Sequence, residues 1–112
     1  MNFNEYQHAA ERTANRSEKD NDKFRFANFG LGITGEAGEV ADLLKKHVFH
    51  GHELNRDKLA KELGDVMWYV ATIATTANLS LEEIAEKNIE KLRKRYPNGF
   101  KTEDSVNRRD EQ

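Results

Sequence analysis

Residues 35–65 read GEAGEVADLLKKHVFHGHELNRDKLAKELGD and hold two acidic pairs within otherwise apolar helical sequence. The first pair is Glu36 with Glu39, and the second is Glu62 with Asp65. Residues three apart share one face of a helix, so each pair points two carboxylates in one direction. The sequence therefore predicts two helices that each present an acidic pair.

A break separates the two pairs. Residues 50–54, HGHEL, interrupt the helical pattern, and Asn55 after them is a typical helix N-cap. If the chain reverses there, both pairs lie roughly 7 to 13 residues from the turn, and at ~1.5 Å per residue they reach nearly the same height on antiparallel helices. The pattern thus predicts a helical hairpin in which Glu36, Glu39, Glu62 and Asp65 converge.

Converging carboxylates repel one another, so a cation is expected among them. The pairs contain neither Cys nor His, and hard oxygen ligands favour Mg²⁺, with Mn²⁺ as a possible substitute, over Zn²⁺. We therefore expect the four acids to be metal ligands. The alternative is that they are solvated surface acids, which is the usual state of a single ExxE motif in a chain that is 34% charged.

The acidic pairs lie in two longer motifs, residues 32–42 (GITGEAGEVAD) and residues 61–71 (KELGDVMWYVA). Together they resemble the ExxE and ExxD signature of MazG-like nucleotide pyrophosphohydrolases, a family of the all-α NTP pyrophosphatase superfamily. The resemblance runs from about Asn4 to Phe100. It implies an all-α, four-helix bundle-like domain over residues 1–100, which leaves residues 101–112 as a polar tail that we expect to be disordered.

Composition narrows the class of protein. A chain of 112 residues supports one domain, and 37% hydrophobic residues give a core small enough to favour association. A net charge of −2 argues against a dedicated nucleic-acid or membrane-surface protein. There is no Cys and no apolar run long enough to be a membrane span or signal peptide, so we expect a cytoplasmic protein without disulfides.

Helical periodicity and caps indicate four main helices. Ser80 with Glu83 forms a capping box before the last of them. Three neighbouring phenylalanines, Phe24, Phe26 and Phe29, are expected in the core, although they could instead stack on a base. The expected helices are Asn4–Arg16, Phe29–Phe49, Asp57–Ala77 and Leu81–Tyr96, with a loop at Ser17–Lys23.

Other polar and aromatic residues are candidates for substrate binding. Tyr69 follows the second acidic pair by one helical turn, where its ring or hydroxyl could touch a nucleotide. Asn88, in the apolar stripe of the last helix, shares a face with Lys91 and Arg95, and this row could meet phosphate. The alternative is a core amide beside two snorkelling cations. The resemblance implies that Asn88, Lys91, Arg95 and Tyr96 hold the nucleotide.

The turn region carries three histidines, His47, His50 and His52. No Cys or further spaced His completes a tetrahedral zinc set, so we expect a loop over the substrate or a solvated turn. The three glycines Gly32, Gly35 and Gly38 open one side of their helix, either to a close-packed neighbour or to a ligand.

The resemblance implies an enzyme that hydrolyses nucleoside triphosphates, NTP or dNTP, to the monophosphate and pyrophosphate with Mg²⁺. Glu36, Glu39, Glu62 and Asp65 would then be both metal ligands and catalytic residues, with one of them, such as Glu39, accepting a proton from water. The resemblance also implies a homodimer or homotetramer. Two alternatives are a di-iron bundle, which the missing Glu-x-x-His motif disfavours, and a non-catalytic association module stabilised by a cation.

Overall fold

The computed structural model describes residues 1–14 and 21–112, and every regular element in them is helical. This confirms the predicted all-α class. The elements, in chain order, are α1 (Phe3–Glu11), α2 (Asp22–Phe49), α3 (Arg56–Thr76), α4 (Leu81–Arg95), α5 (Thr102–Asn107) and a short 3-10 helix, η1 (Arg109–Glu111).

Side-chain caps fix where the four longest helices start. Asn2, Asn21, Asn55 and Ser80 each accept a hydrogen bond from the backbone N–H three residues later, which satisfies a donor with no partner inside the helix. The predicted start of the second helix was Phe29, which was wrong. Helix α2 begins seven residues earlier, at Asp22, because Asn21 caps it there. The first helix ends at Glu11, so the prediction that it continues to Arg16 was wrong for the described residues 12–14. The predicted loop Ser17–Lys23 lies largely outside the described residues.

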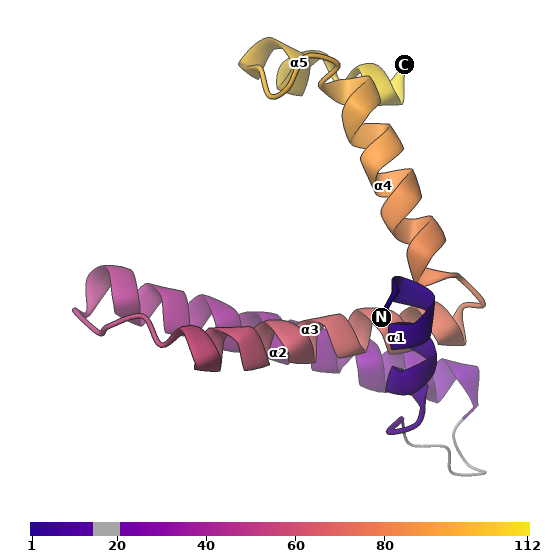
Figure 1. The fold of residues 1–112 in the computed structure, drawn as a ribbon, viewed down its shortest axis with the longest axis vertical. Helices are drawn as coiled ribbons and strands as arrows, with labels where there is room; N and C mark the ends of the chain where they lie inside the picture. The colour runs from indigo at the N-terminus through magenta and orange to yellow at the C-terminus, as the bar shows by residue number, and fades with distance from the viewer. Residues whose placement is uncertain (15–20) are drawn as a thin grey trace.

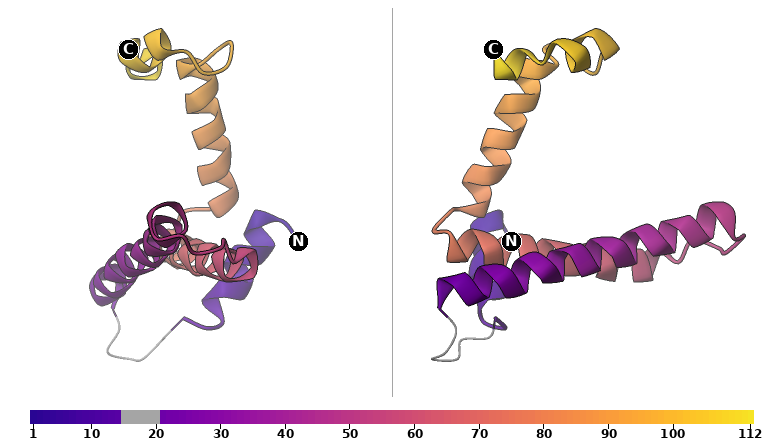
Figure 2. Two further views of the ribbon diagram at one scale, coloured as in Figure 1. Left: turned by 90° about the vertical axis from the view of Figure 1, so that its left-hand side faces the viewer. Right: turned by 180° about the vertical axis from the view of Figure 1, so that it is seen from behind.

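Helices α2 and α3 form the predicted antiparallel hairpin (Figure 1), with Gly51 at a positive φ of 73° in the turn. Helix α1 packs on α3 at the end of the hairpin opposite this turn, and α4 projects away from the same end (Figure 2). The chain is therefore open in shape, with a radius of gyration of 17.2 Å. A compact chain of this length has a radius of about 13 Å.

The packed residues are few and gather where α1 meets α3 and the start of α4. Ala10, Ala71 and Leu81 are buried there, and Tyr6 and Trp68 pack against them. The indole N–H of Trp68 donates to the carbonyl oxygen of Ala10 at 3.1 Å and to Oγ1 of Thr13 at 2.8 Å. These bonds tie the end of α1 to α3.

Only one of the three neighbouring phenylalanines is in the core. Phe29 is 2% exposed, whereas Phe24 is 61% and Phe26 42% exposed, so the prediction was wrong for these two. Arg25, which lies between them, takes the inward position. Its guanidinium donates to Oγ1 of Thr76 at 3.1 Å and to Oε1 of Glu11 at 2.6 Å.

The last residues of the chain are helical, which contradicts the prediction of a disordered tail. Arg95 makes a bidentate ion pair with Asp110, with N–O distances of 2.6 and 2.8 Å, and Arg109 lies 3.5 Å from the buried Asp104. Composition missed this because the segment is held by charge pairs and lacks an apolar face.

Candidate metal centre and nucleotide site

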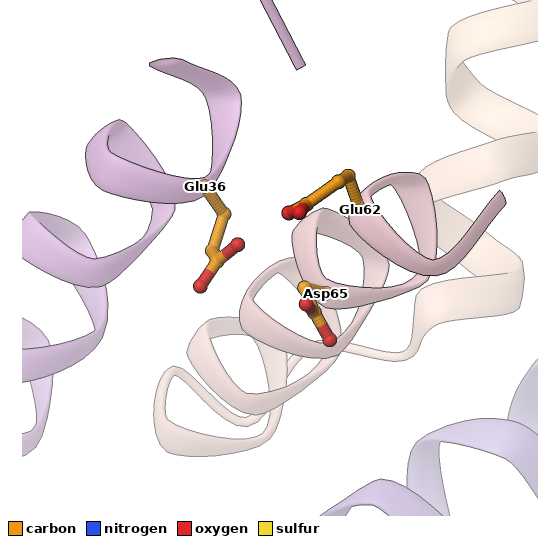
Figure 3. Close-up of side chains that lie close together, drawn as sticks. All are labelled: Glu36, Glu62 and Asp65. Atoms are coloured by element: carbon orange, nitrogen blue, oxygen red, sulfur yellow. The ribbon is translucent and has the colours of Figure 1, made fainter. Parts of the chain in front are cut away.

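Three of the predicted carboxylates meet between α2 and α3. Glu36 comes from α2, Glu62 and Asp65 come from α3, and one oxygen of each lies within 4.8 Å of the others. Figure 3 shows Glu36 facing the other two across the space between the helices. Glu36 and Glu62 are half-buried, while Asp65 is exposed. We call these three residues the acid cluster.

The acid cluster is electrostatically strained. Burial raises the pKa of Glu36 above its usual value, and the charges of Asp65 and Glu62 raise it further. Burial, with a contribution from Asp65, also raises the pKa of Tyr6. A divalent cation would relieve this repulsion, and a set of three carboxylates with no nitrogen or sulfur donor suits Mg²⁺ or Mn²⁺. The donors present therefore fit the expected metal.

Glu39 does not belong to the acid cluster. It is exposed and lies one turn of α2 nearer the hairpin turn, although its charge still contributes to the raised pKa of Glu36. The helical register thus brings together three of the four acids and leaves Glu39 beside them.

Tyr69 lies on the other side of the acid cluster, one turn of α3 from Asp65. Its ring packs directly on Gly32, because a Cβ built at Gly32 would lie 2.2 Å from Cε1 of Tyr69. The ring also lies beside Trp68 and Phe29, with centroid distances of 5.0 and 6.3 Å. Of the three glycines Gly32, Gly35 and Gly38, Gly32 is therefore the one that a neighbouring side chain, Tyr69, approaches closely.

The predicted substrate-binding residues of α4 do not reach the acid cluster of their own chain, because α4 projects away from the hairpin (Figure 1). Asn88 and Lys91 are exposed, so the expectation of Asn88 within a buried stripe was wrong. Arg95 is held by Asp110, and the ring of Tyr96 lies 5.3 Å from that of Phe100.

A pocket of about 320 Å³ lies between the two helices at the turn end of the hairpin. We call it the tip pocket. Glu39 lines it on the side of the acid cluster, and the rest is lined by Asp42, Leu43, Lys46, His52, Glu53, Asn55 and Lys58. Sequence reasoning missed this pocket because Lys46 fitted helix-dipole compensation and His52 a solvated turn. The available signal was a set of basic residues on both sides of the turn.

A helical hairpin that collects carboxylates from both of its helices defines a class of all-α proteins with a site suited to divalent cations. Comparison with known proteins is more specific. The model of the MazG nucleotide pyrophosphohydrolase domain matches residues 24–100, and the chain belongs to this family. The resemblance seen in the paired acidic motifs is thereby confirmed, and the family acts on nucleotides.

One curated relative is the "Gene 37 protein" of Mycobacterium phage L5, which is 41% identical over 73 residues. The alignment covers 62% of this chain and 64% of the phage protein, so it spans less than two thirds of that relative. No solved structure matches the chain. Among the helices of residues 1–14 and 21–112, none combines the length and the apolar character needed to cross a bilayer.

Proposed function

We propose that this protein hydrolyses nucleoside triphosphates, NTP or dNTP, between the α- and β-phosphates, in a reaction that depends on Mg²⁺. The observation that carries the proposal is the meeting of Glu36, Glu62 and Asp65 within a domain of the MazG family. The products are a nucleoside monophosphate and pyrophosphate. We assign the reaction to the cytoplasm, where its substrates are made and used.

Glu36, Glu62 and Asp65 would hold the divalent ion, with Glu39 as a further ligand or as a base. When bound, the ion neutralises phosphate charge and lowers the pKa of water, which makes water a better nucleophile. Without it, the carboxylates would repel a polyanionic substrate. Mn²⁺, with the same preference for oxygen ligands, is the expected substitute.

In the reaction, the oxygen of a water molecule forms a bond to the α-phosphorus. The bond from that phosphorus to the oxygen bridging the α- and β-phosphates breaks, and its electron pair leaves with pyrophosphate. A carboxylate oxygen of Glu39 accepts the proton of the water. Glu39 suits this role because it is exposed and lies outside the acid cluster, so its oxygens are not engaged there.

We assign Tyr69 to the nucleoside and the row Asn88, Lys91, Arg95 and Tyr96 to the substrate of a neighbouring subunit. Helix α4 cannot serve its own acid cluster, whereas in a homodimer or homotetramer it can lie over that of another copy. Arg95 would exchange Asp110 for phosphate on binding. Each site would then need two chains.

The surface of the chain supports such an assembly. The accessible surface is 8505 Å², whereas a compact chain of this mass exposes about 6,300 Å². The excess is of the size that one subunit of a stable homodimer buries. Apolar side chains supply part of it, including Leu63 and Met67 on α3 and Ile89 on α4, which are 47%, 43% and 47% exposed.

The proposal is tested by incubating the protein with each NTP and dNTP and Mg²⁺ and measuring pyrophosphate and orthophosphate separately. Glu36→Gln and Asp65→Asn are each expected to abolish pyrophosphate release, while Glu90→Gln, an exposed change on α4, leaves it unchanged. Release of orthophosphate alone would contradict the proposed reaction.

The shared site is tested by mixing two inactive variants, Glu36→Gln and Lys91→Gln. If α4 serves a neighbouring subunit, mixed assemblies regain activity because one of their sites combines an intact acid cluster with an intact Lys91. Absence of any recovery, together with proof that the subunits exchange, would refute a site shared between two chains.

A further inference from the structure

The hairpin has a charge polarity along its length that the reaction itself does not require. On α2, no Lys or Arg occurs between Arg25 and Lys45, and after Lys61 on α3 none occurs before Lys87. Within α2 and α3, the Lys and Arg residues nearest the acid cluster along the chain therefore lie on the side of the turn. On the opposite side lie the aromatic rings of Tyr69, Trp68 and Phe29.

Two of these cations, Lys46 and Lys58, line the tip pocket, together with the carboxylates of Glu39, Asp42 and Glu53. Lys46 lines it from α2 and Lys58 from the first turn of α3, where the start of the helix adds positive partial charge. Its volume of about 320 Å³ is that of about ten water molecules. Glu39 lines the end of the pocket that lies nearest the acid cluster. Glu39 is one turn of α2 from Glu36, so the pocket begins next to the acid cluster along the hairpin.

Lys46 is available to a ligand although it is paired. Its Nζ lies 2.9 Å from Asp42, and Nζ of Lys45 lies 3.2 Å from the same carboxyl. These pairs are about half exposed, so each contributes little to stability. When Lys46 turns to an anion, Lys45 continues to neutralise Asp42. The cost of recruiting Lys46 is therefore small.

We propose that the tip pocket binds the β- and γ-phosphates of the substrate, and the pyrophosphate formed from them, with Lys46 and Lys58 donating to phosphate oxygens. The nucleoside then lies on the Tyr69 side of the acid cluster. The proposal rests on the proposed function for the identity of the substrate, and it adds the direction in which the substrate lies along the hairpin.

The test uses inorganic pyrophosphate as the probe, measured by calorimetry in the presence of Mg²⁺ and as an inhibitor of turnover. Lys46→Gln and Lys58→Gln are each expected to weaken pyrophosphate binding at least tenfold and to raise KM by a similar factor. Inhibition by the nucleoside monophosphate should change less than twofold. Lys45→Gln is the matched control. Like Lys46→Gln, it removes one positive charge that pairs with Asp42, but Lys45 does not line the pocket.

A variant of opposite sign strengthens the test. Glu53 is a carboxylate in the pocket lining, so Glu53→Gln is expected to tighten pyrophosphate binding. Equal effects of Lys45→Gln and Lys46→Gln on pyrophosphate binding would overturn the proposal, because the effect would then come from the net charge of the protein and not from a contact in the pocket. Weaker binding of the nucleoside monophosphate alone would also overturn the proposal, because the substrate would then lie in the opposite direction along the hairpin.

The calorimetric arm separates this proposal from the proposed function. Tight, Lys46-dependent binding of pyrophosphate by a protein without turnover would support the pocket while the proposed reaction fails. Turnover by a protein whose pyrophosphate affinity does not respond to Lys46 or Lys58 would refute the pocket and leave the reaction in place.

Discussion

The contact between Gly32 and Tyr69 gives a prediction whose size follows from the structure. A methyl group at Gly32 would lie 2.2 Å from Cε1, 2.4 Å from Cζ and 2.8 Å from the hydroxyl of Tyr69. The ring cannot turn away freely, because Trp68 and Phe29 lie beside it. Overpacking of this kind costs about 1–3 kcal/mol, while replacing a helical glycine by alanine gains about 1 kcal/mol. Gly32→Ala is therefore expected to lower the free energy of unfolding by about 0–2 kcal/mol.

Two neighbouring glycines supply matched controls. Gly35 and Gly38 lie in the same helix, and a Cβ at either would meet no atom within 4 Å. Gly35→Ala and Gly38→Ala should each raise the free energy of unfolding by about 1 kcal/mol. The measurement is urea unfolding followed by circular dichroism, at equal protein concentration because association contributes to stability.

Removing the ring should reverse the sign of the effect. In a Tyr69→Ala background, Gly32→Ala has nothing to strike and should stabilise the protein by about 1 kcal/mol, like the controls. A steric clash between position 32 and Tyr69 is refuted if Gly32→Ala stabilises the wild-type protein as much as Gly35→Ala does, or if its effect is the same with and without Tyr69.

Three further predictions concern a cap, an indole and a carboxyl. Asn55→Ala removes the oxygen that accepts the N–H at position 58, and should cost about 1 kcal/mol in urea unfolding. Trp68→Phe loses the hydrogen bonds to Ala10 and Thr13 and should lower the free energy of unfolding by about 1 kcal/mol. Relative to the wild-type protein, hydrogen exchange should accelerate more in α1 than in α2. Hydrogen bonds from Arg95 lower the pKa of Asp110 to about 2, below the value near 4 of an unfolded chain, so this contact stabilises the fold above about pH 4 and is lost as the pH falls through about 2. An NMR titration of the Asp110 carboxyl should show this midpoint, and Arg95→Met should move it toward 4.

The hairpin and its acids follow from the sequence because they depend on local periodicity. Helical spacing, the break at residues 50–54 and the cap at Asn55 are enough to set the register of the two helices. Register alone brought Glu36, Glu62 and Asp65 together. Whether Glu39 turns inward or outward depends on its angle about the helix axis, which a spacing of three residues does not fix.

What the sequence left out depends on contacts between distant residues. The apolar stripe of α4 predicts that one face of this helix is buried. The stripe does not show whether the same chain or another subunit covers that face, and Ile89 on it is exposed in the single chain. The polar composition of residues 101–112 hides the ion pair between Arg95 and Asp110, because paired charges and free charges have the same composition. Phe24 and Phe26 have the same side chain as the buried Phe29, so composition does not separate them. They are exposed because Arg25, between them, faces Thr76 on α3.

The packed residues Ala10, Ala71 and Leu81 lie at one end of the hairpin, and the carboxylates lie further along it toward the turn. Folding and chemistry therefore draw on separate stretches of the same two helices. Substitutions of exposed side chains close to the turn, other than the cap Asn55, leave the packed residues at the far end of the hairpin untouched. Such a division allows relatives to diverge in specificity on a constant scaffold.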